Sequence, residues 1–155
     1  MSPDELARRC AETLWEGDEA SRELGMRLEQ VGAGCATVAM TVRRAMTNGH
    51  GTAHGGYIFA LADSAFAFAS NSYNERTVAQ ACDIVFVAPA KDGDVLVAEA
   101  VERHRFGRNG IYDVRVTCEG RVVAEFRGRS RTVGPNIVDA AVAGPKVGPD
   151  DGDAG

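Results

Sequence analysis

The stretch from Gly55 to Asn71 constrains the fold more than any other part of the chain. It is apolar, rich in alanine and free of proline, and it has the length of a helix rather than of a strand. A helix that is apolar on nearly all sides must bury most of its surface, because large exposed apolar patches are rare. We therefore predict a long helix that begins just after His54-Gly55-Gly56 and is enclosed by the rest of the domain.

Segments with the alternation and β-branched residues typical of strands lie on both sides of this helix. Short connections with glycine, proline or aspartate separate the later ones, so neighbouring strands should be antiparallel. The economical arrangement is an α+β fold in which a curved antiparallel sheet wraps around the helix. Part of the helix then stays uncovered for a second subunit, and we expect a dimer. The expected strands are 35–42, 78–87, 95–104, 111–118 and 122–132.

The two ends of the chain differ from this middle part. We predict an N-terminal helical segment, 1–24, with helices at about 3–15 and 19–24. The sheet and its long helix should form one domain over 25–133. Residues 134–155 are rich in Gly, Pro, Ala and Asp, which predicts a disordered tail.

Composition excludes several classes of function. A chain of 155 residues suits one domain, and a net charge of −5 argues against nucleic acid as the main partner. The four cysteines form no CxxC pair, which indicates neither a zinc site nor a redox pair and fits a reduced, cytoplasmic protein. The N-terminus lacks the apolar region of a signal peptide, and no run approaches the roughly 18 apolar residues of a membrane span.

Asp63 is the only charged residue between Gly55 and Asn74. It falls in the middle of the predicted helix, where it cannot cap either end, and a carboxylate on an apolar surface is costly unless something satisfies it. One interpretation is that it pairs with an arginine or lies on an exposed strip. The other is that it is a catalytic carboxylate, because apolar surroundings are where catalytic pKa values are tuned.

The start of the helix, His54-Gly55-Gly56, is the second candidate site. The first N–H groups of a helix have no intrahelical partner, and glycines let a ligand approach the backbone, so an anion or oxyanion fits there. A tight turn without a ligand is the plainer interpretation. Gly55 and Asp63 are separated by eight residues, about 12 Å along a helix, too far to act on one carbonyl. Two antiparallel helices across a twofold axis would bring Gly55 of one protomer to Asp63 of the other.

Five segments of the chain form a combined pattern. They are Asn48-Gly49-His50, His54-Gly55-Gly56 through Leu61-Ala62-Asp63 to Phe66, Arg103-His104 with Gly107, Gly110 to Asp113, and Phe126 to Ser130. Together they resemble the PaaI group of hot-dog thioesterases, named for phenylacetate degradation, and the resemblance covers roughly residues 25–133 and the order of the elements. It implies a dimer assembled into a tetramer and hydrolysis of acyl-CoA thioesters, with phenylacetyl-CoA or hydroxyphenylacetyl-CoA as the expected substrate.

The same resemblance implies roles for individual residues. Asp63 would be the nucleophile or the base that activates water, and the Gly55 N–H would polarise the thioester carbonyl. Asn48 and His54 would orient the substrate or the loop, and Ser64 would help to position water. Gly56 and Phe59 are further candidates for substrate contact. The turn Gly107-Arg108-Asn109-Gly110 is a candidate for contact with coenzyme A.

Other interpretations compete with these. His50 and His54 have HxxxH spacing, but the surrounding glycines argue against a helix there, and we expect neither a metal nor a cofactor. The arginines around the turn and on the last strand suit CoA phosphates or, equally, a charged sheet edge. A non-catalytic acyl-CoA binding or sensing module on the same fold is the alternative function, although it would not need Asp63. The motif expected of a hot-dog dehydratase is not present.

Overall fold

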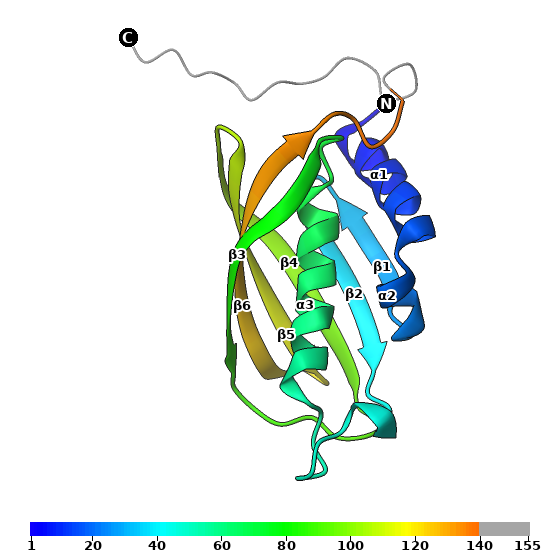
Figure 1. Ribbon diagram of the computed structural model, residues 1–155, viewed down its shortest axis with the longest axis vertical. Coiled ribbons are helices and arrows are strands. Elements are labelled where there is room, and N and C mark those ends of the chain that lie inside the picture. Colours follow the sequence, from blue (N-terminus) through cyan, green and yellow to red (C-terminus); the bar gives the residue numbers. More distant parts are fainter. Residues whose placement is uncertain (140–155) are drawn as a thin grey trace.

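The computed structural model describes residues 1–139, in which one long helix lies against a curved sheet (Figure 1). The predicted α+β fold is confirmed. The sheet has six strands in the order β1-β2-β4-β5-β6-β3, and all neighbours are antiparallel. The elements are α1 (Pro3–Gly17), α2 (Glu19–Glu23), β1 (Arg27–Gly32), β2 (Cys35–Thr41), the 3₁₀ helix η1 (Arg44–Met46), α3 (Gly55–Ser70), β3 (Arg76–Phe86), β4 (Val95–Phe106), β5 (Asn109–Cys118) and β6 (Arg121–Gly134).

The long helix α3 is confirmed and ends where predicted, but it begins at Gly55 rather than just after Gly56, because His54 caps it. His54 is its N-cap, and the His54 Nδ1 accepts a hydrogen bond from the Gly56 N–H at 3.0 Å. Asn71 is its C-cap. Its apolar side chains pack against the inner faces of β2, β4 and β5, so that the helix fills the concave side of the sheet. The buried residues of α3 are Ile58, Leu61, Ala62, Ala65, Phe66, Phe68, Ala69 and Ser70.

A glycine in β6 lets the helix approach the sheet. A Cβ atom on Gly128 would lie 2.8 Å from the ring of Phe66, so any larger residue would push the buried ring away. Gly128 also pairs with Cys82 of β3, so the edge strand β3 is joined to β6 at the point where the helix packs on the sheet.

One strand, β1, was not predicted. Its two inward residues, Leu28 and Val31, are three positions apart rather than two, because a β-bulge lies between Leu28 and Gln30. The bulge removes the alternation by which a strand is recognised in a sequence. The order of elements is therefore two strands, the long helix and four strands, rather than one, the helix and four.

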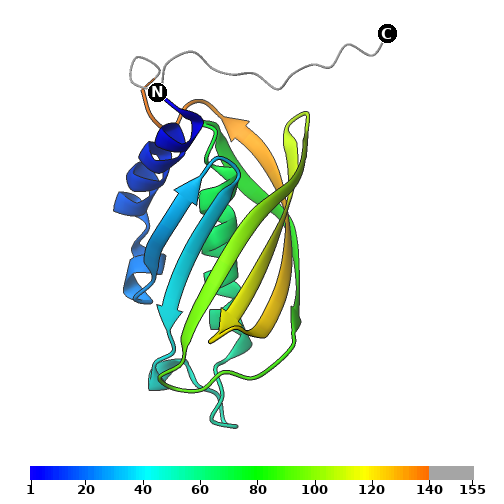
Figure 2. The same cartoon turned by 180° about the vertical axis from the view of Figure 1, so that it is seen from behind.

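The N-terminal helices lie along the β1 side of the sheet (Figure 2). Helix α1 begins with a capping box, in which Ser2 and Glu5 satisfy each other's backbone N–H groups. Its buried face carries Ala7, Cys10 and Ala11. No helix within residues 1–139 is both long and apolar enough to cross a membrane.

The chain after β6 packs back on the loop that follows α3. The Oδ1 atom of Asn74 accepts hydrogen bonds from the N–H groups of Ile137 and Val138, at 2.9 and 2.8 Å. The remainder of the predicted tail, 140–155, lies outside the described residues, and the proposed domain limits stay predictions.

Candidate active site

Asp63 is half-buried in the middle of α3. Burial raises the pKa of its carboxyl group, and the nearby charge of Asp18 raises it further. No ion pair within residues 1–139 involves Asp63, so the structure does not bear out the interpretation that an arginine neutralises it. A carboxylate in these surroundings is a stronger base than one in water.

Hydrogen bonds link Ser64, the residue after Asp63, to the N-terminal segment. The Oγ atoms of Ser64 and Ser21 are 2.8 Å apart, and the Ser21 hydroxyl donates to Asp18 Oδ2 at 2.7 Å. Asp18 also caps α2, since its Oδ1 accepts from the Ser21 N–H at 3.0 Å. Reasoning from sequence did not assign Asp18 or Ser21 to the site. An aspartate before a short helix signals a cap, but nothing local shows that Ser21 meets a residue 43 positions further on.

The start of α3 keeps one backbone donor free. His54 occupies the N–H of Gly56, whereas no atom of residues 1–139 accepts a hydrogen bond from the N–H of Gly55. The phenyl ring of Phe86 lies against Gly55, because a Cβ added there would be 2.9 Å from the ring Cζ atom. The glycine therefore has an explanation within the monomer, a close-packed ring, in addition to the ligand approach that the sequence suggested.

Asn48 organises the loop that leads into α3. Its Oδ1 atom accepts hydrogen bonds from the N–H of His50 at 2.9 Å, and from the N–H and hydroxyl of Thr52 at 3.3 and 3.2 Å. Of the two roles expected for Asn48, the orientation of the loop is the one these contacts support.

Strand β3 runs alongside α3 in the opposite direction (Figure 1). Near its end, Phe86 lies against Gly55. Cys82 lies four residues before Phe86 in β3. The pKa of its thiol is raised mainly by burial and further by the charge of Asp63. The spacing is consistent, since four strand residues and eight helix residues both span about 12–13 Å. Within one chain, Asp63 therefore lies near Cys82 and Gly55 lies near Phe86, at positions about 12 Å apart along β3.

The ring of Phe59 packs edge-on against Phe126, with centroids 5.4 Å apart. Phe59 is half-buried and lies between Gly55 and Asp63 on the helix. The ring therefore contacts the core, and its predicted contact with substrate stays a prediction.

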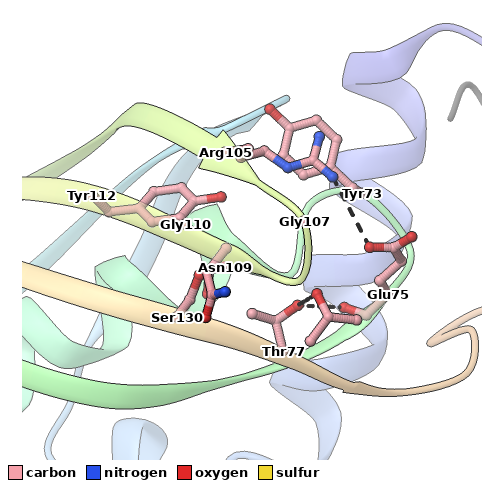
Figure 3. Close-up of a pocket in the computed structure, with 11 residues that line it drawn as sticks. Tyr73, Glu75, Thr77, Arg105, Gly107, Asn109, Gly110, Tyr112 and Ser130 are labelled. Atoms are coloured by element: carbon pink, nitrogen blue, oxygen red, sulfur yellow. Dashed lines mark hydrogen bonds and ion pairs between the residues drawn. The ribbon is translucent and has the colours of Figure 1, made fainter. Parts of the chain in front are cut away.

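The turn Gly107–Gly110 lies beyond the other end of α3, near Ser70 and Tyr73 (Figure 3). Together they line a cavity of about 10 Å³, room for a single water molecule. A nucleotide cannot enter a cavity of this size, and the predicted contact of the turn with coenzyme A stays a prediction. Arg108 is exposed there, and its carbonyl accepts from the Thr132 N–H at 2.8 Å.

Two of the candidate arginines are already engaged on the outer face of the sheet. Arg103 and Arg127 both donate to the carboxylate of Asp113, at 2.6–2.9 Å. Arg105 stacks on the ring of Tyr73, 3.6 Å from the ring centroid. Strands β4, β5 and β6 lie inside the sheet, so Arg103 and Arg127 form a charged cluster on its face and not the charged sheet edge that was the alternative expectation.

Comparisons with known proteins agree with this fold. A family model described as the thioesterase superfamily matches residues 50–125. The chain is 42% identical over 132 residues to acyl-coenzyme A thioesterase PaaI of Escherichia coli (strain K12), which covers 84% of this chain and 94% of that protein. It is 33% identical over 112 residues to a putative esterase of Archaeoglobus fulgidus, covering 72% of this chain and 73% of that protein.

Solved structures give the same result. The E. coli PaaI protein of the phenylacetic acid degradation operon superposes with a TM-score of 0.86 at 40% identity, covering 87% of this chain and 99% of that one. A Streptococcus mutans UA159 protein bound to acetyl CoA gives a TM-score of 0.69 at 27% identity, covering 72% of this chain and 90% of that one.

The chain belongs to the thioesterase superfamily, in its PaaI-type group of hot-dog acyl-CoA thioesterases, and is an enzyme. The resemblance drawn from its motifs is therefore confirmed. The role of each site residue, the substrate and the cytoplasmic location stay predictions.

Proposed function

We propose that the protein hydrolyses aryl-acetyl-CoA thioesters, such as phenylacetyl-CoA or hydroxyphenylacetyl-CoA, at two equivalent sites shared between subunits. Asp63 of one subunit acts on a thioester whose carbonyl oxygen accepts the Gly55 N–H of the partner subunit. The observation that carries this proposal is the distance between two groups of one chain. The free Gly55 N–H lies near Phe86 of β3, whereas the half-buried Asp63 lies about 12 Å away, near Cys82.

The open edge of β3 supports the shared site. Val85 and Phe86 are 61% and 51% exposed, and β3 has a hydrogen-bonding neighbour on one side only. If two β3 strands pair antiparallel with Ile84 opposite its own copy, Cys82 lies opposite Phe86 of the partner subunit. Because Phe86 lies against Gly55 and Cys82 is close enough to couple with Asp63, this register brings the two groups together.

The reaction balances in either form that Asp63 can support. As a base, it takes a proton from water, whose oxygen attacks the thioester carbon. The C–S bond then breaks, and the CoA thiolate recovers the proton from Asp63. As a nucleophile, it attacks the carbonyl carbon, and the C–S bond breaks to release CoA thiolate and leave an anhydride. Water then hydrolyses the anhydride, which frees the acid, restores the Asp63 carboxylate and supplies the proton that the thiolate takes up. The raised pKa of Asp63 makes it a better base, and it must be ionised in both routes.

The substrate class rests on the relatives. The E. coli relative is named an acyl-CoA thioesterase and belongs to a phenylacetic acid degradation operon, and the S. mutans structure holds acetyl CoA. Phe59 between the two catalytic levels offers an aromatic surface for an aryl group. A panel of aryl and aliphatic acyl-CoAs would rank the substrates directly, with turnover measured as the rate at which free CoA thiol appears.

The first test is the Asp63→Asn variant. We expect kcat to fall by roughly 10²–10⁴-fold, because an amide can neither accept the proton nor attack. Asp92→Asn removes an exposed carboxylate from a distant turn and should keep the wild-type rate. Wild-type turnover in a folded Asp63→Asn protein would refute the assigned role.

A mixing experiment tests whether the site is shared. Gly55→Pro removes the N–H donor at the first helical position, where proline is tolerated and where His54 is already extended. The end of the exposed Phe86 side chain can move aside. Asp63→Asn and Gly55→Pro should each be inactive alone. After unfolding and refolding together they should recover about one quarter of wild-type activity, since half the dimers are mixed and each has one intact site. No recovery would place both groups in one chain.

A further inference from the structure

Phe86 differs from the other phenylalanines of the chain. The other five of the six each pack on a second aromatic ring, whereas no aromatic ring of residues 1–139 packs on Phe86. Its side chain is 51% exposed, although it follows Cys82 and Ile84 on the face of β3 that is turned toward α3. The ring therefore has surface left for a contact that one subunit does not supply.

The tip of the Phe86 ring lies beside the free backbone donor of α3. A Cβ atom on Gly55 would be 2.9 Å from Cζ and 3.2 and 3.3 Å from the two Cε atoms, so the ring meets the glycine with its edge. Because a Cβ atom is about 2.5 Å from the nitrogen of its own residue, the Cζ atom lies within about 5.4 Å of the Gly55 nitrogen. An edge contact leaves both faces of the ring uncovered by the glycine.

A carbonyl oxygen bound to the Gly55 N–H brings its acyl group within reach of this ring. The oxygen would lie about 2.9 Å from the nitrogen, and the first carbon of the acyl chain about 2.4 Å from the oxygen. In a helix the Cα–Cβ bonds tilt toward the N-terminus, where the first N–H groups also point. The ring and the carbonyl therefore lie on the same side of Gly55, and a group attached to that first carbon can contact the ring.

The surroundings of Phe86 suit a hydrocarbon group. Its partner in β6 is Ala124, a small buried residue, and the next pair along the two strands is Ile84 with Phe126. Phe126 in turn packs on Phe59, one turn into α3. The wall beside the free N–H is therefore apolar and aromatic. It fits an acyl group better than the pantetheine chain of CoA, whose amides are costly to bury without partners.

We propose that Phe86 determines which acyl groups the enzyme hydrolyses: the acyl group packs on the exposed ring, and an aryl-acetyl group gains more from this contact than a short chain does. The inference rests on the proposed function, because it takes the Gly55 N–H as the donor to the thioester carbonyl. Two aromatic rings bury a large apolar area and attract each other further in edge-to-face or offset contact. Such a contact raises kcat/KM for the substrates that make it.

The test compares two substrates in one preparation of the full-length enzyme. Phenylacetyl-CoA carries a ring that can reach Phe86, whereas acetyl-CoA ends at the first carbon. In Phe86→Ala the ratio of kcat/KM for phenylacetyl-CoA to that for acetyl-CoA should fall roughly tenfold, because the contact between the rings is lost. Any weakening of the dimer lowers both rates alike and cancels in the ratio. Phe106→Ala is the matched control, since Phe106 is 49% exposed at the β4–β5 hairpin, and it should leave the ratio unchanged.

A milder variant decides the question if Phe86→Ala does not fold or dimerise. Phe86→Leu keeps an apolar side chain but has no ring. Its kcat/KM for phenylacetyl-CoA should fall roughly 2–10-fold relative to that for cyclohexylacetyl-CoA, whose saturated ring has the same number of carbons. An unchanged ratio in a folded, dimeric Phe86→Ala, or in Phe86→Leu where it replaces that variant, would mean that Phe86 contacts only the partner subunit or the pantetheine chain. Either result overturns the inference.

The outcome can be separated from that of the proposed function. An inactive Asp63→Asn together with an unchanged ratio in Phe86→Ala overturns this inference alone. Full activity of Asp63→Asn overturns the proposed function. The ratio in Phe86→Ala then still decides whether the acyl group contacts this ring, because it is measured with Asp63 in place.

Discussion

The two edges of the sheet are built in opposite ways. At one edge β1 has six residues, contains a bulge, exposes polar side chains such as Glu29 and Gln30, and is accompanied by α1 (Figure 2). At the other edge β3 has eleven residues and exposes Val78, Val85 and Phe86. Proteins protect sheet edges by short strands, bulges, charge or covering elements. The β1 edge combines all of these. Strand β3 has register irregularities near Arg76 and Ala79 and exposes Asp83, but it is nearly twice as long, its last residues are apolar, and no strand of residues 1–139 pairs with its outer side.

The difference indicates that β3 is made to be paired. It is also the strand that borders the candidate site, since Cys82 is coupled to Asp63 and Phe86 lies against Gly55. An exposed apolar edge beside catalytic groups is explained if the same surface completes both the sheet and the active site. The edge comparison therefore links oligomeric state to catalysis.

The largest effect is expected from a charge placed on β3. In the proposed register Val85 lies opposite Asp83 of the partner subunit, and cross-strand like charges repel. Val85→Asp should weaken dimerisation roughly 10- to 100-fold, because two such pairs form per dimer, and hydrolysis should fall with the dimer fraction. Sedimentation at several concentrations, with activity measured in parallel, tests this.

Two matched variants sharpen that result. Val85→Lys introduces a charge of the opposite sign, which the partner's Asp83 can neutralise, and should dimerise better than Val85→Asp. Gln30→Asp places the same acidic charge on the β1 edge and should alter neither association nor activity. Equal loss in Val85→Asp and Val85→Lys would contradict the register centred on Ile84, though not the pairing of β3 itself.

The next largest effect is expected from substituting one glycine near each edge, Gly128 in β6 beside β3 and Gly32 in β1. A Cβ on Gly128 would lie 2.8 Å from the buried ring of Phe66, whereas a Cβ on Gly32 would lie 3.0–3.1 Å from the side-chain ends of Asp4 and Cys35. Gly128→Ala should lower the free energy of unfolding by roughly 1–3 kcal/mol, because a packed core cannot absorb the methyl group. Gly32→Ala should lie near zero, since the gain in chain stiffness offsets a small shift. Chemical denaturation of both variants checks the order.

The same contrast explains what the sequence could predict. The helix α3 and strands β2, β4, β5 and β6 follow from apolar patterns that the structure preserves, and the motif around Asp63 was enough for the family. Strand β1 was missed because its bulge breaks the period. The contact between Ser21 and Ser64 joins residues 43 positions apart, and the ring that lies against Gly55 comes from Phe86, 31 positions later. Local patterns carry no information about such contacts.

A smaller effect is expected where α1 is fastened to the β1 edge. The Ala33 N–H donates to Asp4 Oδ1 at 2.9 Å, which ties the first turn of α1 to the β1–β2 turn. Asp4→Ala should cost roughly 0.5–1.5 kcal/mol of unfolding free energy, the usual net value of one hydrogen bond. Hydrogen exchange in Asp4→Ala should be faster than in wild type for the amides of β1 and unchanged for those of β3. Glu12→Ala on the exposed side of α1 serves as the control. An equal loss of unfolding free energy in that variant would mean that the hydrogen bond of Asp4 does not hold α1 to the β1–β2 turn.

The smallest effect concerns the face between the two edges, where exposed charges already have partners. Hydrogen bonds from Arg127, and next from Arg103, hold the pKa of Asp113 below its ordinary value, against the opposing effect of partial burial. A depressed carboxyl pKa stabilises the folded state above the ordinary value of about 3.9, and that stabilisation is lost as the pH falls through the lower folded value. The unfolding temperature of wild type should therefore slightly exceed that of Asp113→Asn at pH 7, and the difference should shrink as the pH falls below about 4. A difference that grew on acidification would have the wrong sign for this ion pair. Because all three side chains are satisfied within one subunit, the variant should leave dimerisation and hydrolysis unchanged, in contrast to a single charge on the unpaired edge of β3.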